Sequence, residues 1–202
     1  MIIEFCTESI VDAEKAESNG ANRIELCANL DEGGLTPNVE IVSNLLNTIK
    51  IPVRVILRPT NSFKLTKEDF KSIKKSIDSF TNLNIEGFVF GYLNADNTID
   101  IKATEKILAL APTKKWTFHK AIDSTRDILE ATKSLEPHTQ IDTILSSGGQ
   151  EKAHDGLNTL LAMQSASSKT IMPGGSITWK NCDTFKLTKG FQALHGRRIV
   201  RI

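Results

Sequence analysis

The sequence has little cysteine, almost no net charge and no long apolar run. Three of its 202 residues are cysteines, and 25 basic residues against 24 acidic ones give a net charge of +1. Because the basic residues are spread along the chain, its electrostatics favour neither a nucleic-acid partner nor a membrane surface. No segment approaches the roughly 20 apolar residues that cross a bilayer, and the first residues carry no basic targeting region. We therefore expect no nucleic-acid and no membrane partner.

The few cysteines also bear on the compartment. Cys6, Cys27 and Cys182 are odd in number and contain no Cys-X-X-Cys pair, so a disulfide framework is not expected. The reducing cytoplasm is the natural setting for such a chain. No linker, low-complexity segment or block of like charges interrupts the sequence. We therefore expect one domain over residues 1–202.

Short β-rich apolar runs alternate with segments of helical period along the chain. The runs occupy residues 2–6, 23–26, 53–58, 87–91, 116–119, 143–146, 170–172 and 192–195. Such alternation is typical of parallel β/α architecture, and eight units favour a closed (β/α)8 TIM-type barrel over an open sheet.

Polar residues before several apolar helical segments indicate where helices begin. Thr66 and Asp69 have the spacing of a capping box. Thr36-Pro37 offers a cap and a first-turn proline, and Ser124 with Asp127 offers another helix start.

The end of the chain leaves little room for an eighth helix. Only seven residues follow His195, so we expect the last helix to be short or absent. The uncovered flank, with Ile199 and Val200, would expose apolar surface that a second copy could cover. This predicts a homodimer or a higher homo-oligomer.

Polar side chains gather where the strands are predicted to end, which is where TIM-type barrels carry their sites. Glu4 and Cys6 share one face of the first strand, and Glu25 and Cys27 share one face of the second. A carboxylate buried inside a barrel needs a partner, for which Arg58 at the end of the third strand is a candidate. The alternative is that Glu4, Glu25 and Arg58 form a purely structural ion network.

Two histidines also fall at strand ends. His119 and Asp123 could form an oriented acid/base pair, although Asp123 could instead cap the helix that follows. His195 ends the last strand. The candidate catalytic residues are Glu4, Glu25, Arg58, His119, Asp123 and His195.

Two glycine-rich loops follow the sixth and seventh strands. Glycines let backbone N–H groups approach a ligand, and late loops of barrels often hold phosphate. The candidate anion-binding residues are Ser147, Gly148, Gly149, Gly174 and Gly175.

Several segments together resemble the CutC copper homeostasis family. They are NGANRIELCANLDEGGLTP (residues 19–37), IPVRVILRP (51–59), GFVFG (87–91), TFHKA (117–121), ILSSGGQ (144–150), IMPGG (171–175) and LHG (194–196). The resemblance runs in order through nearly the whole chain. It implies a TIM-type barrel, a cytoplasmic location, dimers or higher oligomers and an association with copper, with Cys6 and Cys27 as candidate Cu(I) ligands.

Three functions stay open at this point. A copper-handling protein fits because Cu(I) is soft and accepts thiolates, although the stagger between neighbouring barrel strands predicts that the Cys6 and Cys27 sulfurs are separated. An enzyme acting on a small anionic metabolite, bearing phosphate or carboxylate, fits the polar strand ends and the glycine loops. A scaffold without catalysis fits the same fold.

Overall fold

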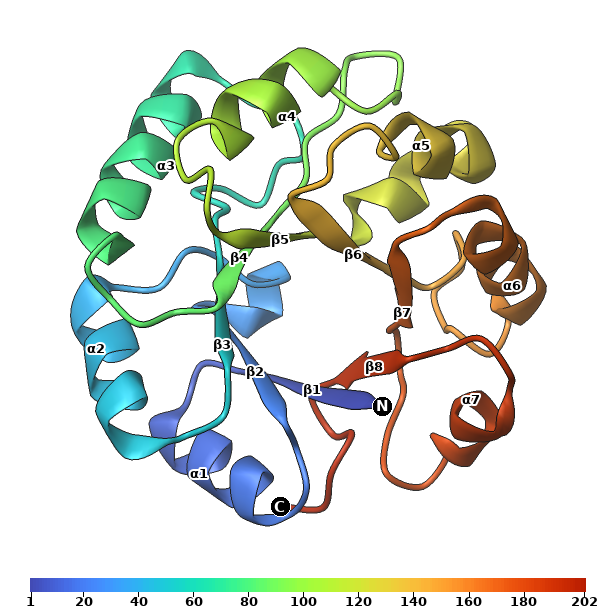
Figure 1. The fold of residues 1–202 in the computed structure, drawn as a ribbon, viewed down its shortest axis with the longest axis horizontal. Helices are drawn as coiled ribbons and strands as arrows, with labels where there is room; N and C mark the ends of the chain where they lie inside the picture. Colours follow the sequence, from blue (N-terminus) through green and yellow to red (C-terminus); the bar gives the residue numbers. More distant parts are fainter.

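The computed structural model describes residues 1–202 as a barrel of eight parallel strands within a ring of helices (Figure 1). The strands are β1 (Ile2–Thr7), β2 (Arg23–Leu26), β3 (Val53–Ile56), β4 (Gly87–Phe90), β5 (Lys115–Phe118), β6 (Ile141–Ser146), β7 (Thr170–Pro173) and β8 (Ala193–Gly196). The strands pair in the order β7-β6-β5-β4-β3-β2-β1-β8, and a single bridge between Gly174 and His195 joins the two ends. The predicted (β/α)8 barrel is confirmed.

Seven helices and two 3-10 turns connect the strands. They are α1 (Ile10–Ser18), η1 (Leu30–Glu32), α2 (Val39–Thr48), α3 (Lys67–Phe80), α4 (Ile101–Leu108), η2 (Lys120–Ser124), α5 (Ile128–Ser134), α6 (Leu157–Ala166) and α7 (Asp183–Leu187). The large apolar core lies between the outer face of the barrel and these helices, where Trp116, Phe88 and Phe185 are fully buried. No helix is both long and apolar enough to cross a membrane.

The helix starts agree only in part with the sequence signals. The capping box of Thr66 and Asp69 begins α3 as predicted. The prediction for Thr36-Pro37 is wrong, because Asn38 caps α2 while the Thr36 hydroxyl accepts a hydrogen bond from the Arg58 amide. Asp127 alone caps α5.

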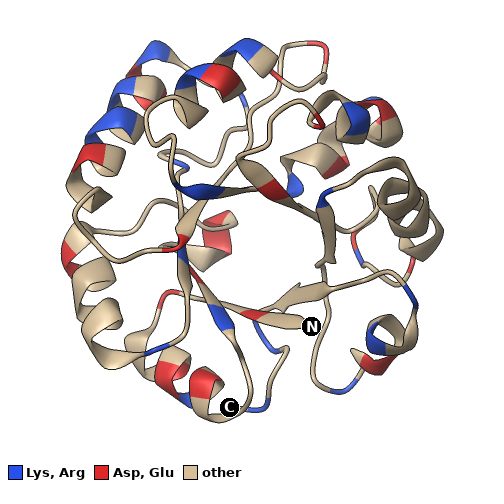
Figure 2. Ribbon diagram, viewed as in Figure 1, with Lys and Arg blue, Asp and Glu red and all other residues tan.

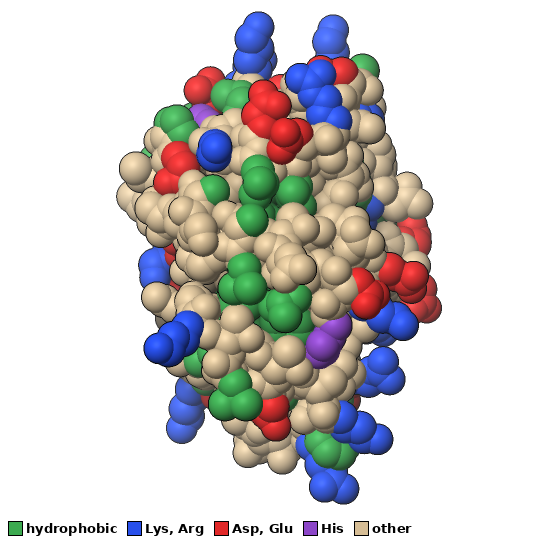
Figure 3. Space-filling model, turned by 90° about the vertical axis from the view of Figure 1, so that its right-hand side faces the viewer, with side chains coloured by type: hydrophobic (Ala, Val, Ile, Leu, Met, Phe, Trp, Pro, Cys, Tyr) green, Lys and Arg blue, Asp and Glu red, His purple; other side chains and the backbone are tan.

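No helix follows β8 in the described residues, as expected. The residues after β8 nevertheless do not expose the apolar side chains that were expected at the surface there. Ile199 and Val200 are only 3% and 8% exposed, because both side chains pack into the large apolar core. The prediction that these two side chains add exposed apolar surface is therefore wrong. On the side of the molecule that carries α6, apolar atoms form small separate groups among polar ones (Figure 3).

Candidate functional site at the barrel mouth

The carboxyl ends of the strands enclose a pocket of about 300 Å³ at the mouth of the barrel. Because side chains alternate along each strand, every second residue points inward. Five predicted site residues meet in this pocket: Cys6, Glu25, Arg58, His119 and His195. Leu30, Ile56, Phe63 and Leu145 supply its apolar wall.

Glu4 lies just below the pocket and is fully buried between two partners. Its carboxylate accepts a hydrogen bond from Arg23 Nε at 2.5 Å and lies 2.8 Å from His195 Nδ1. Burial alone would raise the pKa of Glu4, but Arg23 and His195 outweigh it and lower the pKa to about 2. Glu4 is therefore an ionised carboxylate that orients the His195 ring.

His195 reaches from β8 toward both carboxylates of the mouth. Burial would lower its pKa, but the charge of Glu25 and the hydrogen bond to Glu4 raise it above 6.5. The two carboxylates thus stabilise the charged form of the imidazole relative to a free histidine.

An ion network that the sequence analysis missed fills the barrel below the site. Arg23 and Arg54 share the Glu86 carboxylate, and Arg54 also donates two hydrogen bonds of 2.7 Å to Asp142. Charged positions on the strands, as well as on the helices, are visible in Figure 2. The alternation of side chains along a strand could have indicated this network. Arg23 stands two residues before Glu25, and Arg54 four residues before Arg58, so each arginine is expected on the same inward face as the later residue.

Cys6, Glu25 and Cys27 form a contact group on β1 and the end of β2. Strand pairing sets Cys6 opposite Glu25, and the Cys6 thiol lies 3.4 Å from a carboxylate oxygen of Glu25. The sulfurs of Cys6 and Cys27 are 3.8 Å apart. The expectation that strand stagger separates them is wrong, because the offset is smaller than the reach of the two side chains.

The surroundings of this group disfavour the charged forms of Cys6 and Glu25. The hydrogen bond to Cys27, burial and the Glu25 charge all raise the pKa of the Cys6 thiol well above 9.0. Burial also raises the pKa of Glu25, and the neighbouring Glu4 carboxylate adds to this against the opposing charge of His195. Removing the proton of Cys6 or placing a charge on Glu25 is therefore unfavourable in this site.

Arg58 does not pair with Glu25, which corrects the prediction from sequence. Its guanidinium donates to the backbone carbonyls of Glu32, Gly34 and Asn61, and it lies over the ring of Phe63. The guanidinium of Arg58 is thus bound by backbone carbonyls of the loops after β2 and β3, and no carboxylate pairs with it. These loop carbonyls could not be assigned from sequence because the partners depend on the folded loop conformation.

His119 and Asp123 do not form an acid/base pair either. His119 Nδ1 accepts a hydrogen bond of 3.2 Å from the Ala121 amide, within η2. Burial and the charge of Arg58 lower the pKa of His119 to about 3, so the ring is neutral. With Nδ1 accepting, the hydrogen resides on Nε2, which is buried and has no hydrogen-bond partner.

Asp123 instead fixes the glycine loop after β6. Its carboxylate accepts hydrogen bonds from the amides of Ser147 and Gly149 and from the hydroxyls of Ser146 and Ser147. Gly148 and Gly149 adopt left-handed φ values of 72° and 74°, which aim these amides at one point. The loop therefore binds an anion, as its sequence suggests, but that anion is a side chain of the same protein. The alternative role of Asp123 as a helix cap is also wrong, because Asp127 caps α5.

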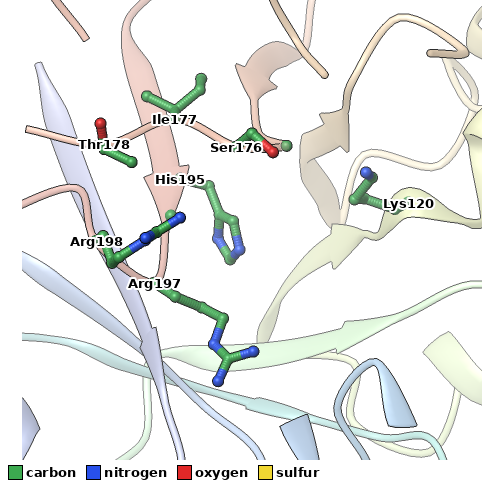
Figure 4. Close-up of a pocket in the computed structure, with 9 residues that line it drawn as sticks. Lys120, Ser176, Ile177, Thr178, His195, Arg197 and Arg198 are labelled. Atoms are coloured by element: carbon green, nitrogen blue, oxygen red, sulfur yellow. The ribbon is translucent and has the colours of Figure 1, made fainter. Parts of the chain in front are cut away.

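A second, larger cavity of about 580 Å³ opens between the loops after β7 and β8 (Figure 4). Gly175 lines it, whereas Gly174 packs against Leu145 and His195 at the barrel seam. Lys120, Arg197 and Arg198 give it a cationic lining that the sequence analysis missed. Two arginines directly after the last predicted strand were the available signal.

The donor atoms of the mouth suit a soft or borderline metal ion. The ligand atoms of Cys6, Glu25 and His195 all lie within 4.8 Å of one another, and Cys27 adds a second thiol beside Cys6. Thiol and imidazole donors favour copper and zinc over magnesium or calcium.

Comparisons with known proteins agree on one family. The CutC family model matches residues 1–200. A CutC family protein from Klebsiella pneumoniae is 35% identical to this chain, and the match covers 96% of this chain and 78% of that protein. A CutC family protein from Mesorhizobium japonicum is 33% identical, and the match covers 96% of this chain and 76% of that protein. The solved structure of the copper homeostasis protein CutC from Streptococcus agalactiae has a TM-score of 0.91 and 26% identity, covering 99% of this chain and 100% of that one. The 2-keto 3-deoxygluconate aldolase from Picrophilus torridus, with a TM-score of 0.63 and 10% identity over 96% of this chain and 73% of its own, shares the barrel fold alone. By these measures the chain belongs to the CutC family.

Proposed function

We propose that this protein acts in copper homeostasis in the cytoplasm and that Cys6 and Cys27 bind one Cu(I) ion. The observation that carries the proposal is the distance of 3.8 Å between the two sulfurs. With metal–sulfur bonds of about 2.3 Å, as in zinc sites, this distance corresponds to a sulfur–metal–sulfur angle of about 110°. That angle suits three or four ligands rather than two in line.

His195 and Glu25 are the candidates for the remaining ligands. Both have a ligand atom within 4.8 Å of the Cys6 sulfur. The imidazole suits Cu(I) better than the carboxylate does, since soft metal ions prefer sulfur and nitrogen. All three cysteines of the chain are free and buried, and the reducing cytoplasm would keep the two ligands as thiols.

Copper binding must displace the proton of the Cys6 thiol. When Glu25 is ionised, its carboxylate oxygen is the nearest acceptor for that proton, because it already receives the thiol hydrogen bond. The raised pKa of Cys6 makes this displacement costly at low pH, so Cu(I) affinity rises with pH.

Competition titration with a coloured Cu(I) chelator, on reduced protein, tests this proposal. We expect Cys6→Ser and Cys27→Ser each to weaken Cu(I) binding and the double variant to abolish it. Cys182→Ser is the matched control, since Cys182 is equally buried but contacts Trp179 and Asp183 far along the chain from the pair. Wild-type affinity in the double variant would rule the proposal out.

A second candidate is an enzyme that acts on a small anionic metabolite. The observation that favours it is the buried His195–Glu4 pair, an oriented imidazole that also lines the cationic cavity. Incubation of the purified protein with a metabolite extract, followed by mass spectrometry, tests it. Substrate loss that depends on His195 supports it, and no change in any metabolite counts against it.

A further inference from the structure

Three residues that line the mouth pocket each carry a buried polar atom without a hydrogen-bond partner. Only four buried side-chain nitrogen or oxygen atoms in the protein lack a hydrogen-bond partner, and Glu25 Oε2, Arg58 Nε and His119 Nε2 are three of them. All three side chains line the same pocket of about 300 Å³. Unpaired buried polar groups are rare and costly in folded proteins. Their concentration in the lining of one pocket therefore indicates that the pocket holds a ligand, and the two donors among them, Arg58 and His119, show what that ligand must offer.

Two of these groups are hydrogen-bond donors held in place by one aromatic ring. His119 is neutral and carries its hydrogen on Nε2, because its Nδ1 accepts from Ala121. Arg58 is fixed by backbone carbonyls and presents Nε–H. Phe63 stacks with both, 4.8 Å from the guanidinium and 5.4 Å from the imidazole. Two fixed donors favour an oxygen of a carboxylate or carbonyl group.

The cationic cavity continues this pocket. Lys120, His195 and Arg197 line both cavities, so the two cavities adjoin and a single ligand can contact both. Lys120 lies 3.9 Å from Asp123, whereas the side chains of Arg197 and Arg198 make no ion pair. No acidic residue lines the cavity, and Ser176 and Thr178 border it. This lining suits a phosphate group.

We propose that the barrel mouth binds a small organic phosphate that also carries a carboxylate or carbonyl oxygen. The phosphate lies against Arg197, Arg198 and Lys120, and the second oxygen group accepts hydrogen bonds from His119 and Arg58. This inference deepens the second candidate function by naming its ligand class. It does not require copper, since neither group of donors includes a cysteine.

Calorimetric titration of reduced, metal-free protein at constant ionic strength tests the inference with two probes, inorganic phosphate and 2-phosphoglycolate. We expect phosphoglycolate to bind about tenfold more tightly or better, because it reaches both sets of donors. Arg198→Gln should weaken both probes by about tenfold, the effect of one charge-assisted hydrogen bond. Arg201→Gln is the control, because Arg201 stacks on Trp179 and does not line either cavity.

His119→Asn tests the other end of the ligand. The asparagine oxygen can replace Nδ1 at the Ala121 amide, so the turn keeps its hydrogen bond while the Nε2 donor is lost. We expect this variant to weaken phosphoglycolate but not phosphate. Equal affinity of wild type for the two probes, equal losses in Arg198→Gln and Arg201→Gln, or no binding at millimolar concentration would overturn the inference. Binding as predicted without any turnover would support the inferred ligand class and would count only against the proposal that the protein is an enzyme.

Discussion

Two carboxylates on neighbouring strands of this barrel have opposite environments. Glu4 is paired with Arg23 and His195, and its pKa is lowered to about 2. Glu25 lies on β2, two residues after Arg23, and contacts the Cys6 thiol. One of its carboxylate oxygens has no hydrogen-bond partner, and its pKa is raised. Glu4 is thus a positioning and structural group, whereas Glu25 is held ready for a ligand or a proton.

Glu25→Gln should therefore leave the melting temperature unchanged or raise it by a few degrees. The amide removes a carboxylate whose charged form is disfavoured by burial and by Glu4, and functional sites often cost stability. Glu4→Gln is the matched control, and it should lower the melting temperature by on the order of 10 °C, because it breaks the buried ion pair with Arg23 and leaves Arg23 only its longer contact to Glu86. Thermal melts of both variants check this. A large loss in Glu25→Gln would make that residue part of the scaffold.

His119 should make the protein less stable in acid. Its folded pKa of about 3 lies below the ordinary 6.5, so below pH 6.5 the unfolded chain takes up a proton that the folded protein refuses. The free energy of unfolding then falls by up to about 1.4 kcal/mol per pH unit between pH 6.5 and 3. His119→Asn should lose this slope in urea unfolding measured across that range.

The other mouth histidine provides the contrast. The pKa of His195 is raised, so its contribution to stability is fully present below pH 6.5 and is lost as pH rises through the folded pKa. His195→Gln should therefore be most destabilised, relative to wild type, in acid. Stability curves for both histidine variants that run parallel to wild type would contradict the assigned environments.

At the scale of elements, the loop after β6 depends on a side chain from η2. Asp123→Ala should cost roughly 3 kcal/mol, because it removes a partly buried carboxylate that accepts several hydrogen bonds. Hydrogen exchange at the amides of Ser147 and Gly149 should accelerate. Asp127→Ala, which removes only the cap of α5, should cost about 1 kcal/mol and leave those amides protected. Unchanged exchange in Asp123→Ala would show that the loop holds itself.

The sequence predicted elements better than partners. Residues 2–6 and 23–26 were assigned as strands from β-rich composition, and alternation correctly turned Glu4, Cys6 and Glu25 inward. The partner of Glu4 could not be predicted, because the run at residues 23–26 is recognised by its β-rich composition, which says nothing about which carboxylate Arg23 contacts. Asp123 was misassigned because its partners lie at residues 146–149, across a β/α unit, and a local spacing cannot specify such a contact.

At the scale of the whole molecule, eight repeated units identified the barrel, but its surface was harder to predict. Because Ile199 and Val200 are buried, an interface of the predicted homo-oligomer would have to use other apolar side chains. Trp179, 42% exposed, and Leu187, 84% exposed, are candidates. We expect sedimentation at micromolar concentration to give a dimer or larger species. A monomer throughout that range would contradict the prediction.

The central claim is that two thiols at the barrel mouth bind one copper ion. X-ray absorption of the reduced protein loaded with one equivalent of Cu(I) tests it most directly. We expect two sulfur neighbours for the copper in wild type and in Cys182→Ser, and none from the protein in the Cys6→Ser, Cys27→Ser double variant. Copper without sulfur neighbours in wild type, or a spectrum that the double variant does not change, would contradict it.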